Sequence, residues 1–337
     1  MKSYLSARQI RSVKVTAAQW RRRVIFLAGG IAVGAAAVVL AQVSDWAQIA
    51  FGAALAKSRY ASFVITPLAG IVFGIEEMSR AFEARTSGLI IATVIAAGLT
   101  SLALLGNYTY FGTSATMLKN GVDWLAIPLC GVAGGLAGGL FSRLVITVAR
   151  GVPGVAGRAI RQHPVAFAFV CGLAVAACGL ASGDTIYGTG YSQVKQALET
   201  GTPMAQGFAP LKFLATLLST ISGLPGGIFA PSLAVGAGLG GDIAPLFPHA
   251  PLAAILLLGM VSYFAGVVQA PITSFVIVTE MTDNHAMVVP LMAASLIAYA
   301  TSRLICHEGI YHALAKGFLA QAAAATAPHQ HHSDVRV

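Results

Sequence analysis

The chain has 337 residues, of which 21 are Lys or Arg and 12 are Asp or Glu, so charged residues make up 10 % of it. An ordinary soluble domain carries roughly 25 %. Because 56 % of the residues are hydrophobic and the mean hydropathy is +0.76, there is too little charge to cover a water-exposed surface. The composition excludes a soluble enzyme, a disordered scaffold and a secreted disulfide protein, and predicts an all-α, multi-pass membrane protein.

The positive charge is concentrated at the N-terminus. Residues 1–23 carry seven basic side chains and no acid, which leaves a net charge of only +2 for the rest of the +9 chain. A basic segment directly before an apolar run favours a cytoplasmic tail and argues against a nucleic-acid-binding surface. An Arg-rich mitochondrial transit peptide is the alternative interpretation of this segment.

Apolar runs follow in two length classes. Six are close to the roughly 20 residues that a spanning helix needs, and four shorter runs are interrupted by Gly and Pro. Broken helices at membrane depth are tolerated where they line a cavity or pack within protein, so the mixture is typical of a channel or transporter. The long runs are 24–43, 88–106, 124–148, 164–182, 252–268 and 286–306, and the short ones are 61–76, 207–222, 226–241 and 270–280.

The distribution of arginine predicts the orientation. Residues 143–161 contain four arginines and no acid, which indicates a cytoplasmic loop, and four crossings before it return the chain to the side of its N-terminus. We therefore expect a basic cytoplasmic tail at 1–23, a membrane domain at 24–317 and a polar tail at 318–337.

No metal or cofactor site is predicted. The four cysteines form no CxxC pair, which argues against a zinc site and a disulfide framework and favours small buried residues. Three histidines near the C-terminus indicate a solvated tail rather than a metal site. They are His329, His331 and His332.

The segment from Gly223 to Gly241, GLPGGIFAPSLAVGAGLGG, is the most informative. Pro231 favours the first turn of a helix, where its missing N–H costs nothing. The residues before it, Gly227, Ile228, Phe229 and Ala230, would then present backbone N–H groups at the positive end of a helix dipole. This arrangement binds an anion without a buried cation, which would hold the anion too tightly for passage. A glycine-packed helix crossing explains the spacing equally well.

A weak internal repeat links two other segments. ITPLAGIVFGIEEM at 65–78 resembles QAPITSFVIVTEM at 269–281, and in each a proline is followed nine residues later by an acid. The pairs are Pro67 with Glu76 and Pro271 with Glu280. Two related halves are typical of transporters built from inverted repeats.

GGIFAP resembles the GxFxP signature of the CLC family of chloride channels and chloride/proton exchangers. Four more segments resemble that family in its own order: TPLAGIVFGIEEMSRAFE, GDTIYGTGYSQVKQALE, APITSFVIVTEMTDNHAMVVPLM and HEGIYHAL. Together they cover about residues 61–318 and imply the CLC inverted-repeat fold. The resemblance also implies chloride or another small anion as the substrate, a homodimer with contacts around 88–106 and 286–318, and a bacterial inner membrane as the location.

The family's site residues carry over at matching positions only. The resemblance implies that the backbone amides of Ile228 and Phe229 bind the central chloride and that the Tyr311 hydroxyl completes the site. It also implies that Glu77, the second acid of the pair, is the inner proton-transfer residue. For Tyr311 the alternative is an interfacial belt tyrosine, and for Glu77 it is a helix-end ion pair with Arg80.

Two motifs of the family, GSGIP and G[KR]EGP, occur nowhere in the sequence. They supply a serine to the central site and the external gating glutamate, so the first half of the fold is incomplete, as though shortened near 63–66. We expect an anion channel or transporter that is impaired or uncoupled. A non-conducting remnant or interaction subunit is the alternative.

An intramembrane enzyme is not supported. His307 and Glu308 lack the second histidine of HExxH, because position 311 is a tyrosine, and no GxSxG occurs. The sequence motifs do not distinguish an anion channel from an anion/proton exchanger.

Overall fold

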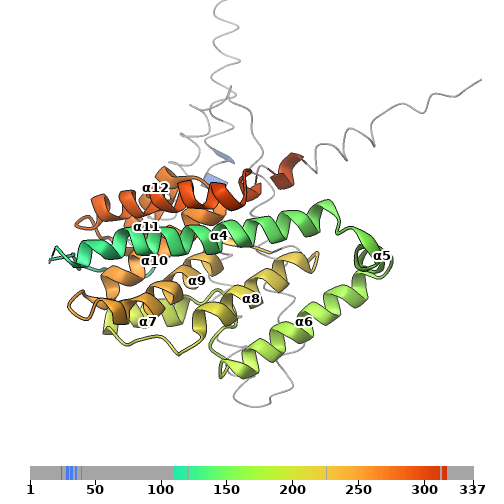
Figure 1. Cartoon of the computed structure of the whole chain (residues 1–337), viewed down its shortest axis with the longest axis horizontal. Helices are drawn as coiled ribbons and strands as arrows, with labels where there is room; N and C mark the ends of the chain where they lie inside the picture. The colour runs from blue at the N-terminus through green and yellow to red at the C-terminus, as the bar shows by residue number, and fades with distance from the viewer. Residues whose placement is uncertain are drawn as a thin grey trace, which may run out of the picture. The chain divides into compact units, whose positions relative to one another are not determined.

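The computed structural model describes residues 110–119, 121–224, 226–311 and 313–316, with scattered helical positions between Val24 and Val39. The chain divides into two units, Met1–Tyr108 and Thr109–Val337, and the architecture given below is that of the second. Its elements are all helical (Figure 1), which confirms the all-α prediction. They are η1 (Asp123–Leu125), α4 (Ala126–Arg150), α5 (Gly154–Gln162), α6 (Pro164–Ala181), α7 (Tyr191–Thr200), α8 (Phe208–Ile221), α9 (Phe229–Ile243), η2 (Ala244–Leu246), α10 (Leu252–Val268), α11 (Pro271–Thr282) and α12 (Val288–Ile305).

The apolar runs of the second unit correspond to these helices. Three helices of the described part are long and apolar enough to cross a bilayer: α6, α12, and α4 together with η1. Two shorter apolar helices are α8 and α10. The interrupted runs at 226–241 and 270–280 become α9 and α11, each with a proline in its first turn. The predicted tail 1–23, the runs 61–76 and 88–106, and the tail 318–337 lie outside the described residues.

The segment 143–161 is not a loop throughout. Its first part completes α4, which ends where Gly151 adopts a φ of 97°, and its last part belongs to α5. Basic residues favour helix C-termini because they offset the negative end of the dipole. Arg150 and Arg161 lie in the last turns of α4 and α5, so the arginines that suggested a loop also suit helix ends.

Helix α10 is the centre of the fold, with every residue from Ala253 to Val267 buried. It packs against α4, α9 and α12 (Figure 1). Side-chain hydroxyls of the neighbouring helices bond its backbone carbonyls. The Ser142 Oγ donates to Val267 O at 3.0 Å and the Ser302 Oγ donates to Gly266 O at 2.6 Å.

Glycines allow the helix backbones to approach closely around α10. A Cβ built at Gly236 of α9 would lie 2.6 Å from the carbonyl oxygen of Gly259, and one at Gly138 of α4 would lie 2.6 Å from that of Tyr263. Contacts of this kind between small residues drive helix association in membranes. The glycine-crossing interpretation of 223–241 is therefore correct for the body of α9.

Helix α6 differs from this core. It packs mainly on α8, and most of its large apolar side chains are exposed, among them Val165, Phe169 and Leu180. A helix that is apolar on its exposed face suits contact with lipid rather than water.

The cysteines of the described part are unpaired. Three are buried and Cys178 is half-buried, as expected for small apolar residues. Within the same residues no group of three or more His, Cys, Asp and Glu side chains is placed to hold a metal ion.

Candidate functional site

The site is built on the first turn of α9, which begins at Phe229 with Ile228 as its N-cap. The first intrahelical donor is Ser232, whose N–H bonds Ile228 O at 3.0 Å. Pro231 has no N–H, so the amides of Phe229 and Ala230 precede the hydrogen-bond ladder. The first turn contains no acid, and no described side chain caps it. The positive end of the helix dipole is therefore not neutralised locally.

These amides lie at the edge of the core rather than in bulk solvent. Ile228 and Ala230 are only 7 % and 8 % exposed. The half-buried ring of Phe229 packs edge-on against Phe264, with a centroid distance of 4.5 Å. Burial lowers the local dielectric, which strengthens the attraction between the backbone dipoles and an anion. Gly227 precedes them at a half-exposed position.

Tyr311 packs against a hydrophobic cluster to which Ile228 also belongs. The same cluster contains Val235, Tyr263 and Ile310. The tyrosine belongs to a short helical stretch in which residues 310–311 and 313–316 are described. The structure thus brings Ile228 and Tyr311 into one cluster. Glu77 and Arg80 lie outside the described residues.

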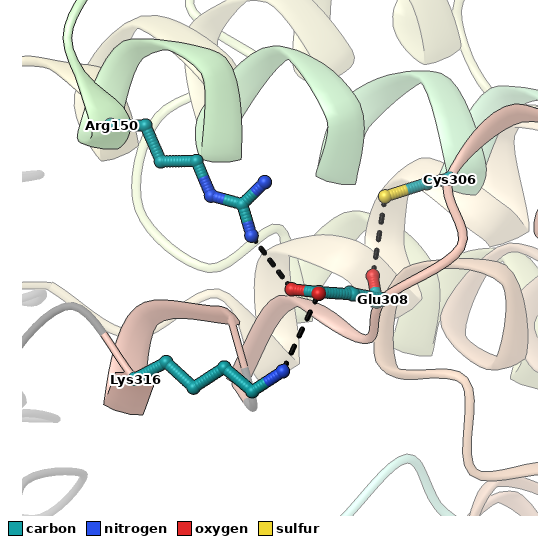
Figure 2. Close-up of polar contacts among 4 residues, drawn as sticks. All are labelled: Arg150, Cys306, Glu308 and Lys316. Carbon is teal, nitrogen blue, oxygen red and sulfur yellow. Dashed lines mark hydrogen bonds and ion pairs between the residues drawn. The ribbon is translucent and has the colours of Figure 1, made fainter.

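The turn before Tyr311 is fixed to the end of α10. Gln269, the C-cap of α10, adopts a left-handed φ of 58° and donates through Nε2 to Cys306 O at 2.6 Å. The Cys306 thiol donates to Glu308 O at 3.2 Å (Figure 2). A Cβ at Gly309 would lie 3.1 Å from Val268 O, so the backbone passes close to α10. These contacts set the position of the helical stretch that follows.

Two features near α9 were missed at the level of sequence. Lys212 of α8 is 2 % exposed, and its ammonium donates to Ile186 O and Gly188 O, both at 2.6 Å. In the sequence, Lys212 stands out only as the single cation in the apolar run 207–222. Tyr263 is fully buried, and its hydroxyl has no hydrogen-bond partner among the described residues. In the sequence, Tyr263 stands out only as the single tyrosine in the apolar run 252–268.

Comparison with known proteins identifies the family. The model of the voltage gated chloride channel family, the CLC family, matches residues 60–303. The chain belongs to the CLC family. The match covers the segments singled out above except HEGIYHAL, which begins at His307 and carries Tyr311. Membership confirms that the chain is not an enzyme.

Two curated relatives carry the name of a proton/chloride exchanger. The H(+)/Cl(-) exchange transporter ClcA of Cronobacter sakazakii is 30 % identical over 272 residues, which cover 73 % of this chain and 54 % of the relative. The ClcA protein of Yersinia pestis is 31 % identical over 276 residues, which cover 76 % of this chain and 55 % of the relative. The chain therefore spans about half the length of the curated relatives it matches.

Solved CLC structures share the fold. A CLC-type fluoride/proton antiporter matches with a TM-score of 0.58 at 20 % identity, over 76 % of this chain and 66 % of the antiporter. A slow cyanobacterial Cl-/H+ antiporter matches with a TM-score of 0.51 at 22 % identity, over 78 % and 66 %. At these identities the likeness establishes the CLC fold, as the sequence resemblance implied.

Proposed function

We propose that this CLC chain binds chloride at the first turn of α9 and conducts it across the membrane. The observation that carries the proposal is the shared cluster of Ile228 and Tyr311 beside an uncapped helix start. The amides of Ile228 and Phe229 and the hydroxyl of Tyr311 are the ligands we assign. Gly227 and Ala230 flank them and shape the turn.

Neutral donors suit an ion that must leave again. A hydrogen bond to a charged group is worth roughly 1.5–3 kcal/mol, so a few of them bind an anion without trapping it. The tyrosine hydroxyl adds one donor and no net charge. The first turn of α9 carries no basic side chain either, so binding there depends on dipoles alone.

We further propose that conduction is uncoupled from proton movement. The sequence lacks both GSGIP and G[KR]EGP, so the serine ligand and the gating glutamate have no counterpart. Exchange needs two proton stations, and Glu77 can supply only the inner one. Other small anions are expected to pass as well, because the incomplete site has fewer donors with which to discriminate.

The test is chloride efflux from liposomes that contain only this chain. We expect wild-type protein to dissipate a chloride gradient without moving protons uphill. Tyr311→Phe should alter the flux, while Tyr299→Phe, whose hydroxyl accepts a bond from Arg303 at 2.9 Å on α12, is the matched control. The absence of all flux would overturn the proposal in favour of a non-conducting remnant or interaction subunit. Proton pumping that stops on Glu77→Gln would show that coupling is retained.

We also propose a homodimer in a bacterial inner membrane. Helix α12 presents exposed apolar side chains, including Val289, Leu296 and Leu304, which suit close packing against a second helix surface. The curated relatives come from bacteria. Cross-linking in native membranes should trap dimers, and recovery of monomer alone would contradict this part of the proposal.

A further inference from the structure

We propose that Glu308 is a positioning residue for the anion site, because its two ion pairs hold the helical stretch that carries Tyr311. The proposal rests on the assignment of Tyr311 as a chloride ligand. It adds a residue that does not touch the anion and acts only through the tyrosine.

The carboxylate of Glu308 bridges two cations (Figure 2). Its Oε2 lies 2.7 Å from Arg150 Nη2, and its Oε1 lies 3.4 Å from Lys316 Nζ. Arg150 is the last residue of α4, whereas Lys316 follows Tyr311 in the terminal helical stretch. Glu308 precedes the tyrosine by three residues and Lys316 follows it by five. The pair with Arg150 therefore ties the start of this stretch to the end of α4, and the pair with Lys316 closes the stretch on itself across Tyr311.

The backbone of the same turn is attached elsewhere. The thiol of Cys306 donates to the carbonyl of Glu308, and Gln269 donates to the carbonyl of Cys306. The main chain at 306–308 is thus fixed to the C-terminus of α10, and the Glu308 side chain is fixed to the C-terminus of α4. With two separate attachments, the segment cannot rotate about either one alone.

Rotation of the segment 310–316 would move Tyr311 relative to the buried side chains on either side of it. Ile310 is fully buried in the cluster that holds Ile228, and Ala313 is nearly so. Tyr311 lies between them in sequence and is half-buried. A hydrogen bond weakens steeply once its distance or angle leaves a narrow range. A small change in the tilt of 310–316 would therefore misplace the hydroxyl relative to the α9 amides without unfolding the core.

The cluster is an ionic one at the protein surface. Side chains of Arg150, Glu308 and Lys316 are 60 %, 37 % and 57 % exposed. Lys316, and after it Arg150, holds the pKa of the Glu308 carboxyl below its ordinary value, so this group is ionised at neutral pH. Exposed pairs of this kind contribute little to global stability. We infer that this one acts instead on the position of Tyr311.

The experiment is a mutant cycle on chloride binding by the purified full-length chain, measured by titration calorimetry in detergent. We expect Glu308→Gln to weaken binding by about two- to fivefold, the range typical of an exposed ion pair. On a Tyr311→Phe background the same change should have no further effect, since its action passes through the hydroxyl. Glu199→Gln, which breaks the exposed Lys195 pair at 3.8 Å on α7, is the matched control and should bind as wild type.

A charge swap and hydrogen exchange complete the test. The triple variant Arg150→Glu, Glu308→Lys and Lys316→Glu restores both opposite pairs and should recover most of the affinity. Amide exchange at 309–316 should rise in Glu308→Gln and return towards wild type in the swap.

Unchanged binding or unchanged exchange in Glu308→Gln, or losses that add in the double mutant with Tyr311→Phe, would overturn the inference. Failure of the wild type to bind chloride would overturn the proposed function instead. In that case the exchange result still decides whether Glu308 holds the segment.

Discussion

Ile228 belongs to one hydrophobic cluster and Tyr311 packs against it, yet only the region that carries Tyr311 is held by ion pairs as well as by neutral contacts. The start of α9 continues into a seam in which its glycines meet the backbone of α10, with Gly236 against Gly259. This seam is buried and neutral. The Tyr311 stretch is instead held at its exposed side by Glu308 and its two cations. The first region should be indifferent to salt and pH, and the second should respond to both.

The difference has a physical sense for an anion pathway. A fixed charge beside the ion would bind it too strongly, so neutral donors serve where the ion sits. Charges can orient a segment from a distance when they lie at a wetter edge, where solvent screens their direct effect on the ion. Neutral groups therefore bind the ion, and ion pairs at the rim orient the segment that carries one of its ligands.

The largest expected effect comes from breaking the seam. In Gly236→Ala the new Cβ would lie 2.6 Å from Gly259 O and 2.7 Å from Met260 Cα, and backbone atoms cannot move aside. Overpacking of this kind costs about 1–3 kcal/mol and occasionally more. We expect a clear fall in the thermal unfolding temperature in detergent. Gly172→Ala on α6 meets nothing within 4 Å and should leave that temperature unchanged or raise it.

The next effect is the loss of the tyrosine donor. Tyr311→Phe removes one hydrogen bond to a charged ligand, worth roughly 1.5–3 kcal/mol, or about ten- to 150-fold in chloride affinity. The unfolding temperature should change little, because the ring remains. Calorimetric titration with chloride measures the first quantity. Equal affinities for Tyr311→Phe and for the Tyr299→Phe control would remove Tyr311 from the site.

A smaller effect should separate the two regions by pH. The pKa of Glu308 is lowered in the folded chain, so its contribution is complete above the ordinary value of 4.5 and is lost as the pH falls through the lowered value. Protection of the amides at 309–316 from exchange, taken relative to the intrinsic rate at each pH, should therefore fall only at acid pH, while protection at the Gly236–Gly259 contact should not. A pH response that survives in Glu308→Gln would contradict this assignment.

The smallest effect should come from salt. At 1 M ionic strength the Debye length is about 3 Å, so the Glu308 pairs are largely screened. With a chloride-free salt, exchange at 309–316 should rise slightly and exchange across the Gly236–Gly259 seam should stay constant. Parallel changes in both regions would show that they are not held by different forces.

Much of the fold could be predicted from the sequence, because long apolar runs and helix-start prolines report on local physics. The runs at 252–268 and 164–182 coincide with α10 and α6 almost to the residue. The prediction of a loop throughout 143–161 was wrong, because a sequence pattern does not distinguish an arginine at a helix end from an arginine in a loop. Lys212 and Tyr263 were missed because their significance depends on what surrounds them, which no local pattern records.

The site was predictable only in part. GGIFAP indicates a helix start by its own chemistry, whereas Tyr311 was assigned through resemblance alone. The Glu308 cluster was not predictable at all. Its members are Arg150, Glu308 and Lys316, and 158 residues separate the first two.

Anomalous diffraction from crystals of the chain grown in bromide tests the proposed chloride site most directly, because bromide replaces chloride with an ion that can be located. We expect anomalous density within hydrogen-bonding distance of the Ile228 and Phe229 amides and the Tyr311 hydroxyl. This density should weaken in Tyr311→Phe. Bromide density elsewhere in the membrane domain, with none at the first turn of α9, would contradict the proposed site.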